Sequence, residues 1–237
     1  MNRVPHLHLL LLAVLMGLLP GAALRAQAPA SPGAAAPPLP SDVDPVSRTR
    51  LPVPRREDLD QDSRRVLDEI FGDRQPPLRW HSPKLAKPMA EAHHYAKYGT
   101  ALGPRLTEIA VLVTARETDN QFEWTQWEEH GQAGRVPPAT EPAIIDIIKY
   151  CKPATGLGAK EAAIITLGRE LLRQKRVSPA TYATTERLFG RGGTVDLVEL
   201  MALYAATGVE VTAFDVQLRP GQHPLLPDRS TIPACQR

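Results

Sequence analysis

The chain has 237 residues, of which 43% are hydrophobic and 23% charged, and this length suits one domain with a sizeable core. It carries 28 basic and 26 acidic residues. Arg3 and Arg25 lie in a leader without acids, so the rest of the chain is neutral. Lysine and arginine are scattered rather than clustered, which argues against a nucleic-acid partner.

The first 26 residues have the pattern of a secretory signal. Arg3 precedes an apolar run over residues 9–19, and small residues lead to a cleavage point after Ala26. The run is shorter than the ~20 residues that span a bilayer, although a retained anchor helix is the alternative. We therefore expect an exported protein, periplasmic or secreted, that begins at Gln27 and is not held in a membrane after cleavage.

Residues 27–54 have the composition of a linker. Eight of these 28 residues are proline, and Ala, Ser and Gly are frequent among the others. Such a segment buries too little apolar surface to offset the entropy of ordering it. We expect it to be disordered, the alternative being an extended segment that wraps the domain.

From residue 55 onward the apolar spacing is helical, with no convincing strand signal. Helices are predicted over residues 58–71, 83–102, 104–118, 123–133, 141–152, 159–175, 179–189 and 194–218. Gly72 ends the first, and the glycine-rich residues 190–193 form a turn between the last two. The sequence predicts an all-α bundle of about seven to eight helices over residues 55–220, followed by a C-terminal tail over 221–237.

The last helix has no charged residue between Glu199 and Glu210, and apolar residues cover every side of it. A helix that is apolar all round is buried, either in its own bundle or against another subunit. We therefore expect a homo-oligomer rather than a monomer.

Glu108 is a candidate catalytic residue. It lies within the apolar helix 104–118 and is flanked by Val111, Leu112 and Ala115. Burial there would raise the pKa of the carboxyl toward the range useful for proton transfer. The alternative is a structural ion pair with an arginine.

Glu123 is the second candidate acid, at the start of the next helix. Asn120 to Glu123 is close to a capping box, in which Asn120 is the N-cap and Glu123 reaches back to its amide. The positive end of the helix dipole is expected to lower the pKa of Glu123. Glu108 would then be the general acid and Glu123 the base, or Glu123 would be only a cap.

Three further residues on this helix are candidates for a pocket. Trp124 and Trp127 are three residues apart and could line one side of it, the alternative being that they are core residues. His130 follows Glu123 by two turns and is expected on the same side, as a third catalytic residue or an exposed histidine. On the preceding helix, Arg116 could bind a substrate carboxylate through a bidentate contact.

Metal and cofactor signals are weak. His93 and His94 are adjacent on a helix and point about 100° apart, so they cannot both bind one ion. No cluster has zinc-site spacing, and the glycine-rich turn follows no strand that would make it a phosphate loop. We expect no cofactor.

Several runs resemble the carboxymuconolactone decarboxylase family over residues 58–218. They are Trp80-His81-Ser82-Pro83, Leu106-Thr107-Glu108, Phe122-Glu123-Trp124, Arg176-Val177-Ser178-Pro179-Ala180-Thr181-Tyr182, Phe189-Gly190 and Val195-Asp196-Leu197-Val198-Glu199-Leu200. The resemblance implies the all-α alkylhydroperoxidase D-like fold and assembly into trimers, hexamers or larger rings.

The chain departs from the two chemistries of that family. The alkylhydroperoxidase D branch has a Cys-x-x-Cys pair where this chain has Asn120 and Glu123, and a histidine where it has Trp127. Peroxide reduction through a thiolate is therefore not expected. The decarboxylase branch has Glu-Trp followed by a histidine, and here His130 is the nearby substitute.

The two cysteines, Cys151 and Cys235, are isolated in the sequence. In an exported chain they could form one disulfide that pins the C-terminal tail, and the sequence leaves this pairing open.

The leading functional expectation is acid–base chemistry, including decarboxylation, on a small carboxylated lactone or unsaturated acid. Glu108 and Glu123 would transfer protons, with His130, Trp124 and Trp127 shaping the pocket and Arg116 binding the substrate. The alternative is a non-enzymatic oligomeric binding protein on the same scaffold, with a peroxidase-type antioxidant activity as a lesser option.

Overall fold

The computed structural model describes residues 38–72, 77–132 and 140–236, except for the side chains of residues 130–132. The predicted signal segment and the first part of the predicted linker lie outside the described residues. Within the described part of the chain, no helix is long and apolar enough to cross a membrane.

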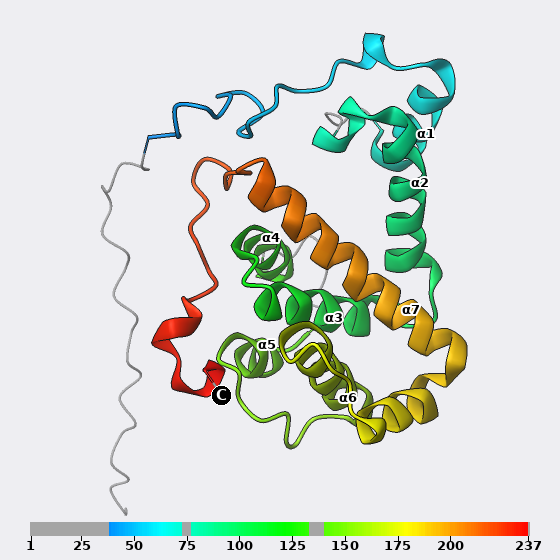
Figure 1. Ribbon diagram of the computed structural model, residues 1–237, viewed down its shortest axis with the longest axis vertical. Coiled ribbons are helices and arrows are strands. Elements are labelled where there is room, and N and C mark those ends of the chain that lie inside the picture. The colour runs from blue at the N-terminus through cyan, green and yellow to red at the C-terminus, as the bar shows by residue number, and fades with distance from the viewer. Residues whose placement is uncertain (1–37, 73–76, 133–139, 237) are drawn as a thin grey trace, which may run out of the picture. The chain divides into compact units, whose positions relative to one another are not determined.

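Seven α-helices make up the described fold, and no strand occurs among these residues (Figure 1). They are α1 (Gln61–Phe71), α2 (Pro83–His94), α3 (Gly103–Glu117), α4 (Gln121–Gln132), α5 (Pro142–Lys149), α6 (Ala159–Gly168) and α7 (Pro179–Ala213). Two π-helical turns, η3 (Tyr95–Gly99) and η4 (Arg169–Arg173), continue α2 and α6. The predicted all-α class is confirmed.

The main core surrounds α3, whose residues from Thr107 to Glu117 are all buried. Helices α4, α5, α6 and α7 all pack against it (Figure 1). A separate apolar cluster joins α1 and α2 through Leu67, Trp80 and Ala86, which are almost fully buried. The arrangement makes α3 the central helix and leaves the turn after it to position α4.

Local signals explain where helices begin and end. Asp60 caps α1 by accepting a hydrogen bond from the Ser63 amide at 2.7 Å, and Gly72 follows it with φ of 59°, which favours glycine. In α7 a single residue, Gly190, breaks the helix with φ of 71° and ψ of 173°. The predicted four-residue turn between the last two helices is therefore a one-residue kink.

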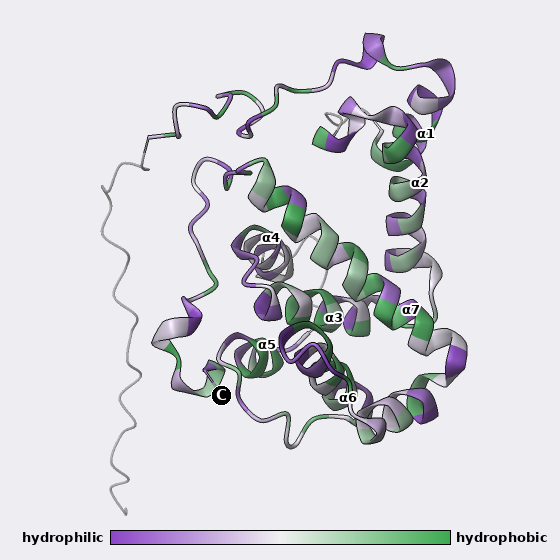
Figure 2. Cartoon of the chain, viewed as in Figure 1, coloured by the Kyte–Doolittle hydropathy of each residue, from purple (hydrophilic) through white to green (hydrophobic). Residues whose placement is uncertain are grey.

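The second half of α7 is not buried all round within one chain. Leu197, Leu200 and Met201 are fully buried, whereas Val195 and Val209 are 60% and 70% exposed. Figure 2 shows the largely hydrophobic colouring of this part of α7. The lack of charge in this helix was explained by burial either in its own bundle or against another subunit. Burial in its own bundle accounts for only one side of the helix.

The last part of the predicted linker, which the structure describes from residue 38, forms hydrogen bonds with the end of α7. The Arg50 amide donates to the Phe214 carbonyl at 2.9 Å, and the Gln217 amide donates to the Arg48 carbonyl at the same distance. The Arg48 guanidinium also donates to the Leu218 carbonyl at 2.9 Å. These bonds to the end of α7 satisfy backbone groups that a disordered segment would leave to water.

The C-terminal tail is attached to the bundle by a disulfide between Cys151 and Cys235, with the two Cα atoms 5.1 Å apart. Both cysteines are buried. The pairing that the sequence left open is therefore present.

Candidate active site around Glu123

Helix α4 presents two different sets of side chains to its surroundings. Glu123 and Trp127 are four residues apart and share one side, and Trp124 and Glu128 share another. The expectation that the two tryptophans line one pocket does not hold, because each is hydrogen-bonded to a different glutamate.

Trp124 lies in the core, with no exposed surface. Its indole N–H donates to Glu128 at 2.5 Å, and the Lys149 ammonium donates to the other oxygen of that carboxylate at 2.5 Å. The same ammonium lies 5.7 Å from the centre of the Trp124 ring. These contacts hold α4 to α5 and give Trp124 a structural environment.

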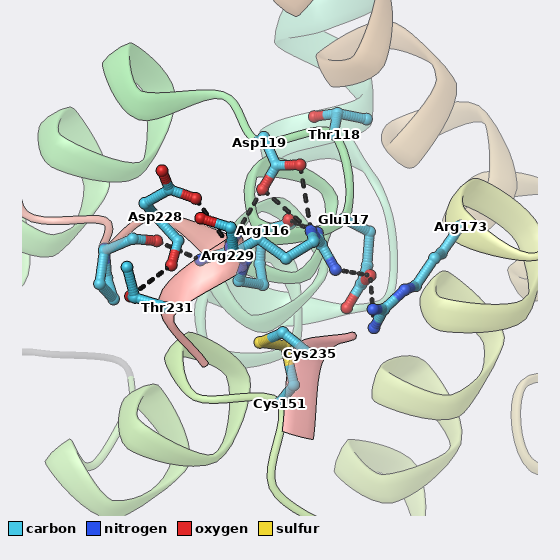
Figure 3. Close-up of polar contacts among 12 residues, drawn as sticks. Arg116, Glu117, Thr118, Asp119, Cys151, Arg173, Asp228, Arg229, Thr231 and Cys235 are labelled. Carbon is cyan, nitrogen blue, oxygen red and sulfur yellow. Dashed lines mark hydrogen bonds and ion pairs between the residues drawn. A yellow bond between two sulfur atoms is a disulfide. The ribbon is translucent and has the colours of Figure 1, made fainter. Parts of the chain in front are cut away.

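Arg116 is also fully buried, at the end of α3 (Figure 3). Its guanidinium donates to the Pro227 carbonyl at 2.8 Å and forms an ion pair with Asp119. Arg229 of the tail binds Asp119 as well, and it reaches the buried carboxylate of Glu117 at 3.3 Å. Arg116 therefore fixes the C-terminal tail, and it is not placed to bind a substrate carboxylate as expected.

The two other predicted catalytic residues are Glu108 and His130. Glu108 is 5% exposed on α3, so its burial is as expected from the apolar residues around it. His130 lies on α4, but its side chain is outside the described residues.

Glu123 is buried, and its surroundings raise the pKa of its carboxyl. Burial raises the pKa of its carboxyl from 4.5 to about 7, while the indole N–H of Trp127 and the cations Lys97 and Arg79 act in the opposite direction. The expected lowering by the helix start is therefore wrong, because desolvation outweighs the dipole at this position. At neutral pH the carboxyl can both accept and donate a proton.

The capping box is formed by one half only. The Glu123 amide donates to the Asn120 side-chain oxygen at 3.1 Å, as predicted for an N-cap. The Asn120 amide donates instead to the Ala115 carbonyl, at 2.8 Å. The Glu123 carboxyl is thus not the partner of that amide, and it turns toward Trp127.

A run of aromatic rings extends from Trp127 to helix α2. The Trp127 ring packs edge to face against the ring of Tyr204 on α7, with the two ring centres 5.7 Å apart. Tyr204 meets His93 in the same way at 5.5 Å. Burial and the Glu123 carboxyl raise the pKa of Tyr204, so its hydroxyl stays protonated at neutral pH.

Three charged groups act on the Glu123 carboxyl: Lys97, Arg79 and Glu210. The Arg79 guanidinium pairs with Glu210 at 2.7 Å. Lys97 lies 4.6 Å from the centre of the Trp127 ring and forms no ion pair among the described residues. An uncompensated ammonium beside a buried acid provides a place for an anionic group of a ligand.

Sequence reasoning missed Lys97, Tyr204 and His93 as members of this site. Tyr204 is an aromatic hydroxyl inside an uncharged helical run, which was the one available signal. His93 was considered only as a metal ligand. No group of three or more residues suited to a metal ion is found in the described part of the chain.

The chain has an all-α fold of the alkylhydroperoxidase D-like type. It is similar to a crystal structure of an "alkylhydroperoxidase AhpD core", an uncharacterized peroxidase-related protein from Ralstonia eutropha JMP134. The TM-score is 0.51 at 16% identity, over 73% of this chain and 93% of the other. No protein-family model and no curated protein matches the sequence. The similarity therefore shows the fold.

Proposed function

We propose that this protein catalyses acid–base chemistry on a small carboxylated lactone or related unsaturated acid, with Glu123 as the group that transfers the proton. The observation that carries the proposal is a buried carboxyl, bonded by Trp127 and next to the unpaired cation Lys97. Lys97 takes the role expected of Arg116 and binds the substrate carboxylate.

The reaction follows from these positions. Ionised Glu123 removes a proton from a carbon next to the substrate carbonyl, and its protonated form returns that proton to another carbon of the conjugated system. If a carboxylate leaves as carbon dioxide, the electron pair of the broken bond stays on the substrate and takes the proton from Glu123. Water then restores the proton to Glu123. Glu108 serves as a second buried acid in this proposal, and His130 as a further member of the pocket.

The test is exchange of substrate protons in deuterium oxide, followed by NMR, with carbon dioxide release measured in parallel. Each of a panel of saturated and unsaturated five-membered lactone acids is incubated with the protein. Glu123→Gln should slow exchange ~100-fold or more, the scale of a lost proton-transfer group. Glu129→Gln, on the same helix and bonded to Gln222 at 2.5 Å, is the matched control.

Two results would contradict the proposal: no exchange with any compound, or equal exchange by wild type and Glu123→Gln. Binding without exchange would favour the alternative, a binding protein on the same scaffold. A thiol peroxidase is disfavoured because both cysteines are joined in the disulfide, away from Glu123 on the sequence.

We also propose that the protein is a homo-oligomer. Val195, Ala202, Ala206 and Val209 are all exposed on α7 and recur at steps of three, four and seven, so they form one stripe. Light scattering should give a trimer or hexamer, and Val209→Lys should reduce the mass. Val46→Lys is the control, since Val46 is equally exposed outside the helix. A monomeric wild type would contradict this.

Export is part of the same proposal and rests on the sequence of the first 26 residues. Mass spectrometry of protein recovered from the periplasm or medium should show a start at Gln27. A chain that keeps Met1 and stays with the cells would contradict it.

A further inference from the structure

Two buried polar atoms, on residues that pack against α7, have no hydrogen-bond partner among the described residues. They are Nδ2 of Asn120 and Nε2 of His93. Buried polar groups are nearly always paired with protein, water or ligand, so each of these atoms calls for an explanation.

The orientation of the Asn120 amide is fixed by its neighbours. Its oxygen accepts the Glu123 amide at 3.1 Å, which is the N-cap bond of α4. The nitrogen must therefore point the other way, and an ideal Cβ on Gly208 of α7 would lie only 2.9 Å from it. A glycine at position 208 leaves room for this donor.

The His93 ring packs edge to face against the ring of Tyr204. Tyr204 lies on α7, one turn before Gly208. Burial lowers the pKa of His93 from 6.5 to about 4, and Arg79 and Lys97 act in the same direction. The imidazole is therefore neutral at pH 7, and Nε2 can donate or accept a hydrogen bond according to its tautomer.

These atoms lie against the part of α7 that also faces the candidate acid. Tyr204 contacts both Trp127 and His93, and the Glu123 carboxyl is near enough to raise the pKa of its phenol. The stretch of α7 from Tyr204 to Gly208 thus contacts both residues that carry an unpaired polar atom, His93 of α2 and the N-cap residue Asn120 of α4, and its Tyr204 lies within electrostatic reach of Glu123.

We propose that Asn120 and His93 bind the carbonyl oxygen of the substrate, beside Glu123. This deepens the proposed function and rests on it, because it names which part of the substrate is recognised. Lys97 binds the carboxylate, whereas the amide N–H of Asn120 and the imidazole N–H of His93 donate hydrogen bonds to the carbonyl oxygen. The same donors stabilise the negative charge that develops on that oxygen when Glu123 removes a neighbouring proton.

Binding of two matched probes tests this inference. The first is a saturated five-membered lactone with a carboxylate on the ring, and the second is the cyclic ether acid that lacks only the carbonyl. Dissociation constants are measured at pH 7 by calorimetry or ligand-observed NMR. Wild type should bind the lactone acid ~10-fold more tightly than the ether acid, which is the difference expected from one or two hydrogen bonds.

Two variants remove one donor each. Asn120→Ser keeps a side-chain oxygen for the N-cap but loses the amide nitrogen, and His93→Phe keeps a ring against Tyr204 but loses both nitrogens. Each should weaken binding of the lactone acid ~10-fold and leave binding of the ether acid unchanged. Asn120→Thr is the second choice if Asn120→Ser unfolds, since its hydroxyl also caps a helix and it adds no charge beside the anionic probes.

The outcomes separate this inference from the proposed function. Unchanged affinity in both variants, or no binding of the lactone acid by wild type, would overturn the inference. If wild type catalyses proton exchange but the Asn120 and His93 variants bind the lactone acid as tightly as wild type does, the inference is overturned and the proposed function stands. Donor-dependent binding without any proton exchange would support the inference and remove the proposed reaction.

Discussion

The indole N–H of Trp127 donates a hydrogen bond to the carboxyl of Glu123, one turn earlier on the same helix. This bond and the cations Lys97 and Arg79 favour the ionised carboxylate, yet burial has the larger effect and raises the pKa to about 7. A carboxyl held near neutrality can exchange protons with a substrate, and it also makes stability depend on pH.

The first prediction concerns that dependence. Because the pKa of Glu123 is higher in the folded than in the unfolded chain, the folded state binds this proton more tightly between pH 4.5 and about 7. Its stability therefore falls as pH rises through this window, by ~3 kcal/mol in total. Glu123→Gln does not titrate, so it should be more stable than wild type at pH 8 and similar to it near pH 4.

Denaturation in urea at several pH values measures this difference. A gap between variant and wild type that does not widen from pH 4 to pH 8 would show that Glu123 has an ordinary pKa.

The second prediction concerns the disulfide. Cys151 and Cys235 are separated by 84 residues, so their bond restricts the unfolded chain strongly. Reduction should lower the free energy of unfolding by ~2–4 kcal/mol. The double variant Cys151→Ser/Cys235→Ser should start at the lower stability and show no response to reductant. Two free thiols in the unfolded, unreduced protein would contradict the assignment.

The third prediction concerns the buried ion pair between Lys149 and Glu128. Side chains of both are largely shielded, at 12% and 7% exposure, and their atoms are 2.5 Å apart. Lys149→Met removes the ammonium from a buried carboxylate and should cost ~3 kcal/mol. Lys87→Met, which breaks an ion pair with exposed Asp62, should cost under ~1 kcal/mol. Equal costs in thermal unfolding would argue against burial of the first pair.

The fourth prediction concerns the contact of α6 with α3. A Cβ on Gly168 would clash with the Val113 side chain and lie 3.3 Å from Met201. Gly168→Ala should therefore destabilise the protein by ~2 kcal/mol, and adding Val113→Ala should recover ~1 kcal/mol of the summed cost. Gly192→Ala, which meets no atom within 4 Å, should be neutral or stabilising. If the losses of stability caused by Gly168→Ala and Val113→Ala simply add in the double variant, the clash is contradicted.

Much of the fold could be predicted from local pattern. The apolar spacing located all seven helices, and Gly72, Gly190 and the cap at Asn120 marked ends or breaks where predicted. These signals act over a few residues, so the sequence carries them directly. The sequence predicted that the last helix ends at residue 218, whereas α7 ends at Ala213. The residues after it bond to Arg48 and Arg50, about 165 positions earlier, and no local pattern encodes such contacts.

The candidate site divides in the same way. The sequence by itself determined that Glu123 begins a helix, that no Cys-x-x-Cys pair stands there, and that the fold is all-α. Only the tertiary structure decided that its pKa rises, since the helix dipole is a local effect whereas desolvation depends on what packs around the carboxyl. It likewise brought His93 to Tyr204, a contact between two helices distant in the sequence, which no local pattern encodes.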